Sequence, residues 1–82
     1  MTSQFILYSR EGCHLCEDMI EQLQPYCEKY NFNIEIIDVD RTPQLQQKYG
    51  LSVPILYYQQ ADKNEEICKY FLEPNSLLSF LT

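Results

Sequence analysis

The sequence predicts one α/β domain, residues 1–82, in which helices flank a mixed four-stranded sheet in the order β-α-β-α-β-β-α. Three observations lead to this fold class. An amphipathic helix lies between two short apolar strands, the pattern of a right-handed crossover that joins parallel strands. A second, short helix follows, bounded by proline and glycine. Two further strands, separated by a polar loop, are then expected to pair as a hairpin, which makes the sheet mixed.

The first predicted strand is the apolar run from Gln4 to Tyr8, of the kind that is buried in a parallel sheet. A long helix is predicted from Cys13 to Tyr30, because apolar residues recur there at steps of three and four and polar residues fill the other face. The apolar positions are Cys16, Met19, Ile20, Leu23, Cys27 and Tyr30. Pro25 lies within this helix and is expected to kink it or to split off its last turn.

The middle of the chain predicts a second strand and a short helix. The segment Ile34–Val39, Ile-Glu-Ile-Ile-Asp-Val, follows a turn at Asn31 to Asn33 and is predicted as the second strand. Thr42 is a suitable N-cap, and Pro43 fits the first helical position. This helix is expected to end at Tyr49 and to stop at Gly50.

The last third of the chain predicts a hairpin and a terminal helix. Pro54 opens the third strand, Ile55–Tyr58. A polar loop at Gln59–Asn64 separates it from the fourth strand, Glu65–Tyr70. The terminal helix starts at Glu73-Pro74, and its apolar face is formed by Leu77, Leu78 and Leu81.

Composition and charge exclude several classes of function. The apolar content of 45% argues against disorder, and no apolar run approaches the roughly 18 residues of a membrane span. The net charge of −6 makes sequence-independent binding to nucleic acid or to an anionic membrane unfavourable. The N-terminus lacks a basic segment followed by a long apolar run. We therefore expect a cytoplasmic protein rather than a secreted disulfide framework, despite the four cysteines.

Two of the cysteines stand where thiol–disulfide chemistry needs them. Cys13 and Cys16 follow the first strand and a turn that contains Gly12, and they open the long helix. A helix N-terminus has unpaired N–H groups and a partial positive charge, which favour a thiolate over a thiol. With two residues between the cysteines, the second sulfur can curl back to the first. We therefore assign Cys13 as the attacking thiolate and Cys16 as the resolving thiol.

Four other residues, one histidine, one arginine and two cysteines, each have a functional and a structural interpretation. His14 lies between the cysteines, where a partly cationic ring would stabilise the thiolate; the alternative is an exposed residue with its ordinary pKa. Arg10 is a candidate for steering an anionic substrate, and otherwise a solvated surface residue. Cys27 and Cys68 form no second close pair with which to complete a zinc site. Both are expected to pack as small apolar residues, so no metal ligand is assigned.

Two segments carry a resemblance to a known family. Residues 8–16, Tyr-Ser-Arg-Glu-Gly-Cys-His-Leu-Cys, resemble the active-site segment of glutaredoxins, including a basic residue three positions before the first cysteine. Residues 48–54, Lys-Tyr-Gly-Leu-Ser-Val-Pro, are similar to the approach of thioredoxins to their cis-proline. Together with the element order, nearly the whole chain resembles the thioredoxin superfamily. The Cys-His-Leu-Cys motif resembles its small glutaredoxin-like proteins.

The resemblance implies a thioredoxin-like fold and a particular arrangement of the site. It implies that the Val53-Pro54 peptide bond is cis and packs beside the two sulfurs. It also implies that the backbone of Val53 pairs with an extended substrate. With Arg10 and His14, Val53 and Pro54 complete the predicted substrate-binding set.

One segment departs from the glutaredoxin pattern. Glutaredoxins carry a glycine pair and an acidic residue between the fourth strand and the last helix, where they hold the carboxylate of glutathione. This chain has Tyr70 and Phe71 there and no glycine. A bulky side chain at such a position obstructs close approach of a ligand to the backbone.

The sequence therefore predicts a monomeric thiol–disulfide oxidoreductase that acts on protein or small-thiol disulfides without a bound cofactor. We expect a protein dithiol to reduce it better than glutathione does. Two other classes remain open at this point. One is a non-enzymatic module that binds extended peptides, and the other is a carrier of an iron–sulfur cluster shared between two subunits.

Overall fold

The computed structural model describes residues 3–60 and 62–81, and their elements follow the predicted order β-α-β-α-β-β-α. The limits 1 and 82 of the predicted domain, and residue 61 of the predicted loop, lie outside the described residues. The elements are β1 (Ser3–Ser9), α1 (His14–Tyr30), β2 (Ile34–Asp38), a short 3-10 helix η1 (Val39–Arg41), α2 (Pro43–Tyr49), β3 (Ile55–Gln60), β4 (Lys63–Lys69) and α3 (Pro74–Leu81).

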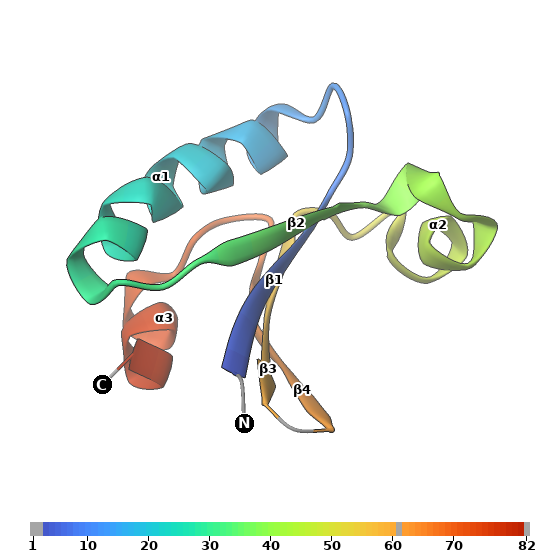
Figure 1. Ribbon diagram of the computed structural model, residues 1–82. Coiled ribbons are helices and arrows are strands. Elements are labelled where there is room, and N and C mark those ends of the chain that lie inside the picture. Colours follow the sequence, from blue (N-terminus) through green and yellow to red (C-terminus); the bar gives the residue numbers. More distant parts are fainter. Residues whose placement is uncertain (1–2, 61, 82) are drawn as a thin grey trace.

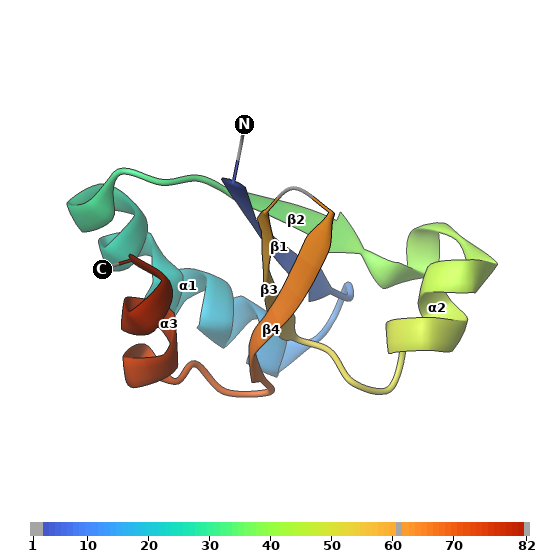
Figure 2. The ribbon, with the colours of Figure 1, turned by 90° about the horizontal axis from the view of Figure 1, so that it is seen from below.

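The sheet is mixed, as predicted, with the strand order β2-β1-β3-β4. β1 pairs with β2 in parallel, and with β3 in the antiparallel sense. β4 completes the hairpin with β3. Helices α1 and α3 lie on one side of the sheet and α2 lies on the other (Figures 1 and 2).

Alternation along the strands produces a core on each face of the sheet, because successive side chains of a strand point to opposite faces. Phe5 and Leu7 of β1 point towards α1 and α3, while Tyr8 belongs to the other face. The larger cluster of buried residues contains Phe5, Leu7, Met19, Leu23, Leu56, Ile67, Cys68 and Leu77. The smaller cluster contains Val39, Tyr49 and Ile55.

The register of the central strands brings two loops to one edge of the sheet. Tyr8, near the end of β1, pairs with Ile55, the first residue of β3. The segment that leads from β1 into α1 therefore starts beside the Val53-Pro54 segment that leads into β3. The Val53-Pro54 bond is cis, which confirms this part of the prediction.

Several predicted strand boundaries are wrong by one or two residues, including both ends of the first strand. Val39 lies in η1 instead of the second strand, because the Asp38 side chain accepts a hydrogen bond from the Asp40 N–H at 2.9 Å and turns the chain. The hairpin strands extend further into the predicted polar loop, since exposed polar residues pair as well as apolar ones in an edge hairpin. Tyr70 is not in β4, because its φ of 69° is left-handed and cannot continue a strand.

Pro25 neither splits nor ends α1, which continues to Tyr30 as a single helix. Pro25 and Glu21 are both exposed, so water can bond the Glu21 carbonyl that loses its N–H partner.

Cys27 is half-buried rather than fully buried. No helix in the described part of the chain has the length and apolar character that a bilayer crossing requires.

Candidate active site

Cys13 and Cys16 form a disulfide, with their Cα atoms 5.2 Å apart. Gly12 supplies a left-handed turn, with φ 76°, and the Cys13 N–H donates to the Arg10 carbonyl at 3.3 Å. Cys13 is the N-cap of α1 and has extended backbone angles. Its Sγ accepts a hydrogen bond from the Cys16 N–H at 3.2 Å. A backbone N–H of the first turn thus points at this sulfur, an arrangement that favours a thiolate over a thiol.

The two sulfurs differ in access to solvent. Cys13 is half-buried at the start of the helix, whereas Cys16 is only 1% exposed. The other two thiols belong to no disulfide, and burial raises the pKa of Cys27 and of Cys68. Of the two bonded sulfurs, Cys13 is therefore the more accessible.

His14 turns away from the protein. Its side chain is 96% exposed, and its Nδ1 lies 3.7 Å from Oε2 of Glu17, one turn along α1. The structure thus places the ring next to a carboxylate. Whether His14 supports the Cys13 thiolate stays a prediction.

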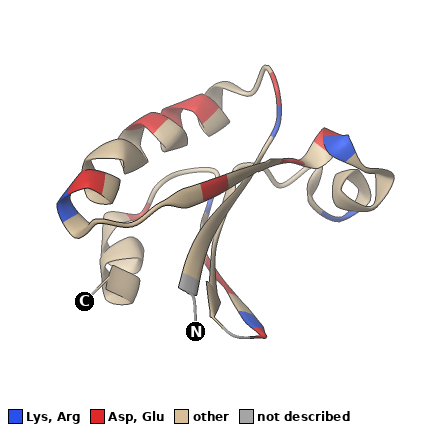
Figure 3. Ribbon diagram, in the orientation of Figure 1, with Lys and Arg blue, Asp and Glu red and all other residues tan. Residues whose placement is uncertain are grey.

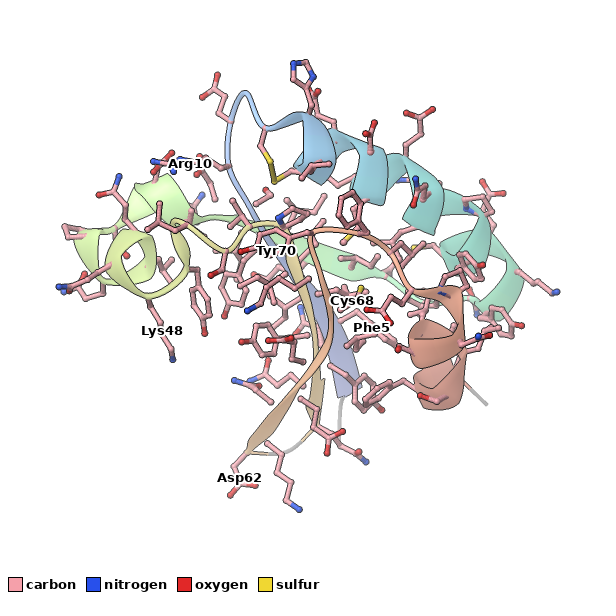
Figure 4. All side chains as sticks on the ribbon, turned by 180° about the vertical axis from the view of Figure 1, so that it is seen from behind. Phe5, Arg10, Lys48, Asp62, Cys68 and Tyr70 are labelled. Carbon is pink, nitrogen blue, oxygen red and sulfur yellow. A yellow bond between two sulfur atoms is a disulfide. The ribbon has the colours of Figure 1, made fainter. Side chains whose placement is uncertain are left out.

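Arg10 is tied to two segments that are remote in the sequence. Its Nε donates to Oδ2 of Asp40 at 3.0 Å, and its Nη1 donates to the Gly50 carbonyl at 3.0 Å. Hydrogen bonds from Gln46 and Arg10 lower the pKa of Asp40. Figure 4 shows Arg10 beside η1 and α2 rather than over the disulfide. Its guanidinium holds the cysteine loop against the loop that precedes the cis-proline.

The cis-proline segment is held from its other side by Tyr70. The Tyr70 N–H donates to the Pro54 carbonyl at 2.8 Å. The Tyr70 hydroxyl donates to the Leu51 carbonyl at 3.3 Å. Within the described part of the chain, neither the N–H nor the C=O of Val53 has a hydrogen-bond partner. The backbone that the resemblance implied for substrate pairing is therefore available.

The segment after β4 forms a tight turn around Tyr70. The Phe71 N–H donates to the Lys69 carbonyl at 2.8 Å, which closes a three-residue γ-turn whose central residue has positive φ. Both N–H groups of the Tyr70–Phe71 pair are thus bonded within the protein. The sequence placed a bulky pair here, but it gave no sign of the left-handed turn, because tyrosine rarely adopts this conformation.

Three tyrosines pack together on the α2 face of the sheet. The rings of Tyr8 and Tyr49 are stacked, with centroids 4.2 Å apart, and Tyr57 meets both at its edge. Burial, together with the neighbouring Tyr49 hydroxyl, raises the pKa of Tyr8 to about 12. This cluster anchors the end of β1 just before the cysteine loop. The sequence indicated only that Tyr8 and Tyr49 lie near the site.

In the described ranges 3–60 and 62–81, no group of three or more His, Cys, Asp or Glu side chains is placed to hold a metal ion. The chemistry that this arrangement supports is exchange at one disulfide. It combines a partly accessible sulfur at a helix N-terminus with a buried partner sulfur. In the neighbouring loop, the N–H and C=O of Val53 have no hydrogen-bond partner among the described residues.

Comparisons with known proteins agree with this geometry. The family described as "Glutaredoxin-like domain (DUF836)" matches residues 4–82. The solution structure of protein Ne2328 from Nitrosomonas europaea is 34% identical, with a TM-score of 0.82, covering 100% of this chain and 94% of that one. A protein from X. campestris is 26% identical, with a TM-score of 0.68 and coverage of 94% and 93%. No curated protein matches this chain.

The fold also extends to proteins of much lower identity. The germline-specific thioredoxin Deadhead of Drosophila melanogaster is 17% identical, with a TM-score of 0.71, covering 98% of this chain and 78% of that one. This likeness shows the fold alone. The chain has the thioredoxin-like α/β fold, and it belongs to the glutaredoxin-like domain family.

Proposed function

We propose that this protein is a thiol–disulfide oxidoreductase that uses Cys13 and Cys16 as a dithiol/disulfide pair. In the reduced form, the Cys13 thiolate attacks one sulfur of a substrate disulfide, forms a mixed disulfide and releases one substrate thiolate. Cys16 then loses its proton and attacks Sγ of Cys13. This step breaks the mixed disulfide and releases the second thiolate. Two electrons pass to the substrate, and the protein is left with the Cys13–Cys16 disulfide.

The observation that carries this proposal is the unequal exposure of two bonded sulfurs at the N-terminus of α1. A nucleophilic sulfur has to be reached by the substrate, and a resolving sulfur has to be shielded from it. Half-buried Cys13 and almost fully buried Cys16 meet these requirements. The hydrogen bond from the Cys16 N–H to Sγ of Cys13 also favours charge on the attacking sulfur.

Insulin reduction in the presence of dithiothreitol tests the proposal. The native protein should accelerate precipitation of the insulin chains, whereas Cys13→Ser should not. Cys27→Ser is the matched control, because Cys27 is another thiol of α1 outside the site, and it should retain activity. Full activity of Cys13→Ser would refute the assignment, and a peptide-binding module would show no turnover at all.

We further propose that a protein dithiol is the reductant in preference to glutathione, in a reducing compartment such as the cytoplasm. Three groups that would bind the charged ends of a tripeptide are engaged elsewhere. Arg10 is bonded to Asp40 and Gly50. The N–H groups of Tyr70 and Phe71 are bonded to backbone carbonyls. Losing one or two charge-assisted hydrogen bonds, at about 1.5–3 kcal/mol each, would weaken glutathione binding by a factor between roughly ten and roughly twenty thousand.

This preference is measured by following reduction of the Cys13–Cys16 disulfide with two donors at matched thiol concentration. One is glutathione with glutathione reductase, and the other is a reduced thioredoxin with thioredoxin reductase. We expect faster reduction by the thioredoxin system. Faster reduction by the glutathione system would reverse the proposed preference while leaving the oxidoreductase assignment intact.

A further inference from the structure

Exposed apolar side chains gather beside the disulfide. Among the described residues, five large apolar side chains are exposed, and four of them come from segments that border the site. Leu15 lies between the two cysteines. Leu51 precedes the cis-proline and is 94% exposed. Tyr70 and Phe71 follow β4 and are 39% and 66% exposed. Such a cluster at the edge of a reactive bond is typical of a surface that receives a partner.

Within this surface, a narrow notch of about 60 Å³ separates α1 from the segment after β4. Its walls are mostly apolar, with Leu15 and Met19 on the helix side and Tyr70 and Phe71 opposite. One water needs roughly 10–15 Å³ of such space, so the notch holds about four to six heavy atoms. It has room for the outer part of a single side chain.

The rim of the notch is acidic. Asp18 and Gln22 are its polar members, and the side chain of Asp18 has no ion-pair or hydrogen-bond partner in the described part of the chain. Between residues 11 and 28 the sequence contains five Asp or Glu residues and no Lys or Arg. Figure 3 shows acidic residues along α1, whose last turn carries the basic residue Lys29. A cation near the Asp18 carboxylate is therefore favoured.

We propose that this notch binds a lysine or arginine side chain of the substrate polypeptide, close to the cysteine whose disulfide is reduced. The aliphatic stem of such a side chain fits between Met19 and Phe71, and its cationic head reaches Asp18 at the rim. Tyr70 offers an aromatic face to the same cation. Lys69 already lies 6.0 Å from the centre of that ring, so the Asp18 carboxylate supplies the larger part of the attraction. The inference rests on the proposed function and adds a preference among its substrates.

The test uses short peptide pairs joined by one disulfide, with a fluorophore on one peptide and a quencher on the other. A lysine is placed in turn at each of the three positions on either side of the cysteine, and parallel series carry norleucine or glutamate there. The second-order rate constant for reduction by the reduced protein is measured at 20 mM and at 500 mM salt. Norleucine matches the stem of lysine without its charge, so the ratio of the two rates isolates the cation.

At the best position, the lysine peptide should react roughly two- to fivefold faster than its norleucine counterpart at low salt, the range expected for one surface ion pair. Glutamate should react more slowly than either, and high salt should shrink the differences. Asp18→Asn should bring the lysine-to-norleucine ratio close to one. Glu28→Gln removes the same charge near the other end of α1 and should keep the ratio. Phe71→Ser should slow both the lysine and the norleucine peptides.

Two results would overturn the inference alone. One is a ratio of one at every position in the native protein. The other is an equal loss of preference in Glu28→Gln and Asp18→Asn, which would mean that net charge rather than the notch is responsible. If no peptide of any series is reduced, the proposed function fails and this inference falls with it.

Discussion

Replacing Tyr70 by glycine should destabilise the protein and, at the same time, improve its use of glutathione. Tyr70 is the centre of the γ-turn after β4, and its φ of 69° suits glycine better than tyrosine. Its hydroxyl donates a hydrogen bond to the Leu51 carbonyl. The γ-turn also engages the Phe71 N–H in a hydrogen bond to the Lys69 carbonyl. A glycine can leave this turn and release that N–H for the carboxylate of a ligand.

The two effects have opposite signs and different sizes. With 39% of its surface exposed, the Tyr70 ring buries roughly 120 Å², worth about 3 kcal/mol at 25 cal/mol per Å². The exposed hydroxyl bond adds about 0.5 kcal/mol. Glycine adopts the left-handed backbone without the cost that tyrosine has there, which offsets the loss of stability by about 1–2 kcal/mol. Tyr70→Gly should therefore lower the free energy of unfolding by about 2 kcal/mol, which lowers Tm by roughly 8–16 °C.

The catalytic gain follows from one recovered hydrogen bond between an N–H group and a carboxylate. At about 1.5 kcal/mol it corresponds to roughly tenfold. The assay is the rate at which glutathione reduces the Cys13–Cys16 disulfide, together with urea unfolding of the oxidised protein. Tyr70→Phe is the control, because it keeps the ring and the turn and should change the glutathione rate little. A folded Tyr70→Gly variant that reacts with glutathione no faster than the native protein would refute this reasoning.

Three further changes should have effects that follow directly from the contacts. Gly50→Ala places a Cβ against the backbone carbonyl oxygen of Gln46, and chemical denaturation should show a loss of about 1–3 kcal/mol; an unchanged midpoint would contradict the packing. Hydrogen bonds from Gln46 and Arg10 lower the pKa of Asp40 from 3.8. The ionised carboxylate therefore stabilises the folded protein above pH 3.8, and this stabilisation is lost as the pH falls further and the carboxylate is protonated. The difference in unfolding free energy between the native protein and Asp40→Asn should therefore shrink below about pH 4 and stay constant above pH 5. Burial raises the pKa of Tyr8 from 10.0 to about 12, so the native protein should lose stability between pH 10 and 12, and Tyr8→Phe should lose less over the same range; equal losses would contradict this.

Most of the fold could be predicted from the sequence, because its signals are local. Periodicity identified α1, and the pair Thr42-Pro43 with Gly50 set the limits of α2 to the residue. The predicted boundaries were wrong where a side chain turns the backbone, as Asp38 does at the end of β2. Pro25 failed as a signal of a helix break because it lies on the exposed side of α1.

The same distinction between local and long-range signals applies to the candidate active site. The two cysteines and the cis bond could be predicted, because the motifs that indicate them are contiguous in the sequence. The partners of Arg10 lie 30 and 40 residues away, and no pattern in the sequence connects them. The notch is likewise formed by two segments that only the fold brings together. Tertiary contacts decide which surface charges are free to meet a substrate.

The most direct test of the central claim is to trap the intermediate. Cys16→Ser removes the resolving sulfur, so the mixed disulfide at Cys13 should accumulate when the reduced variant meets a disulfide-linked peptide. Mass spectrometry after proteolysis should find the peptide on Cys13, and not on Cys27 or Cys68. Attachment to either of those thiols, or no attachment at all, would contradict the assignment of Cys13 as the nucleophile.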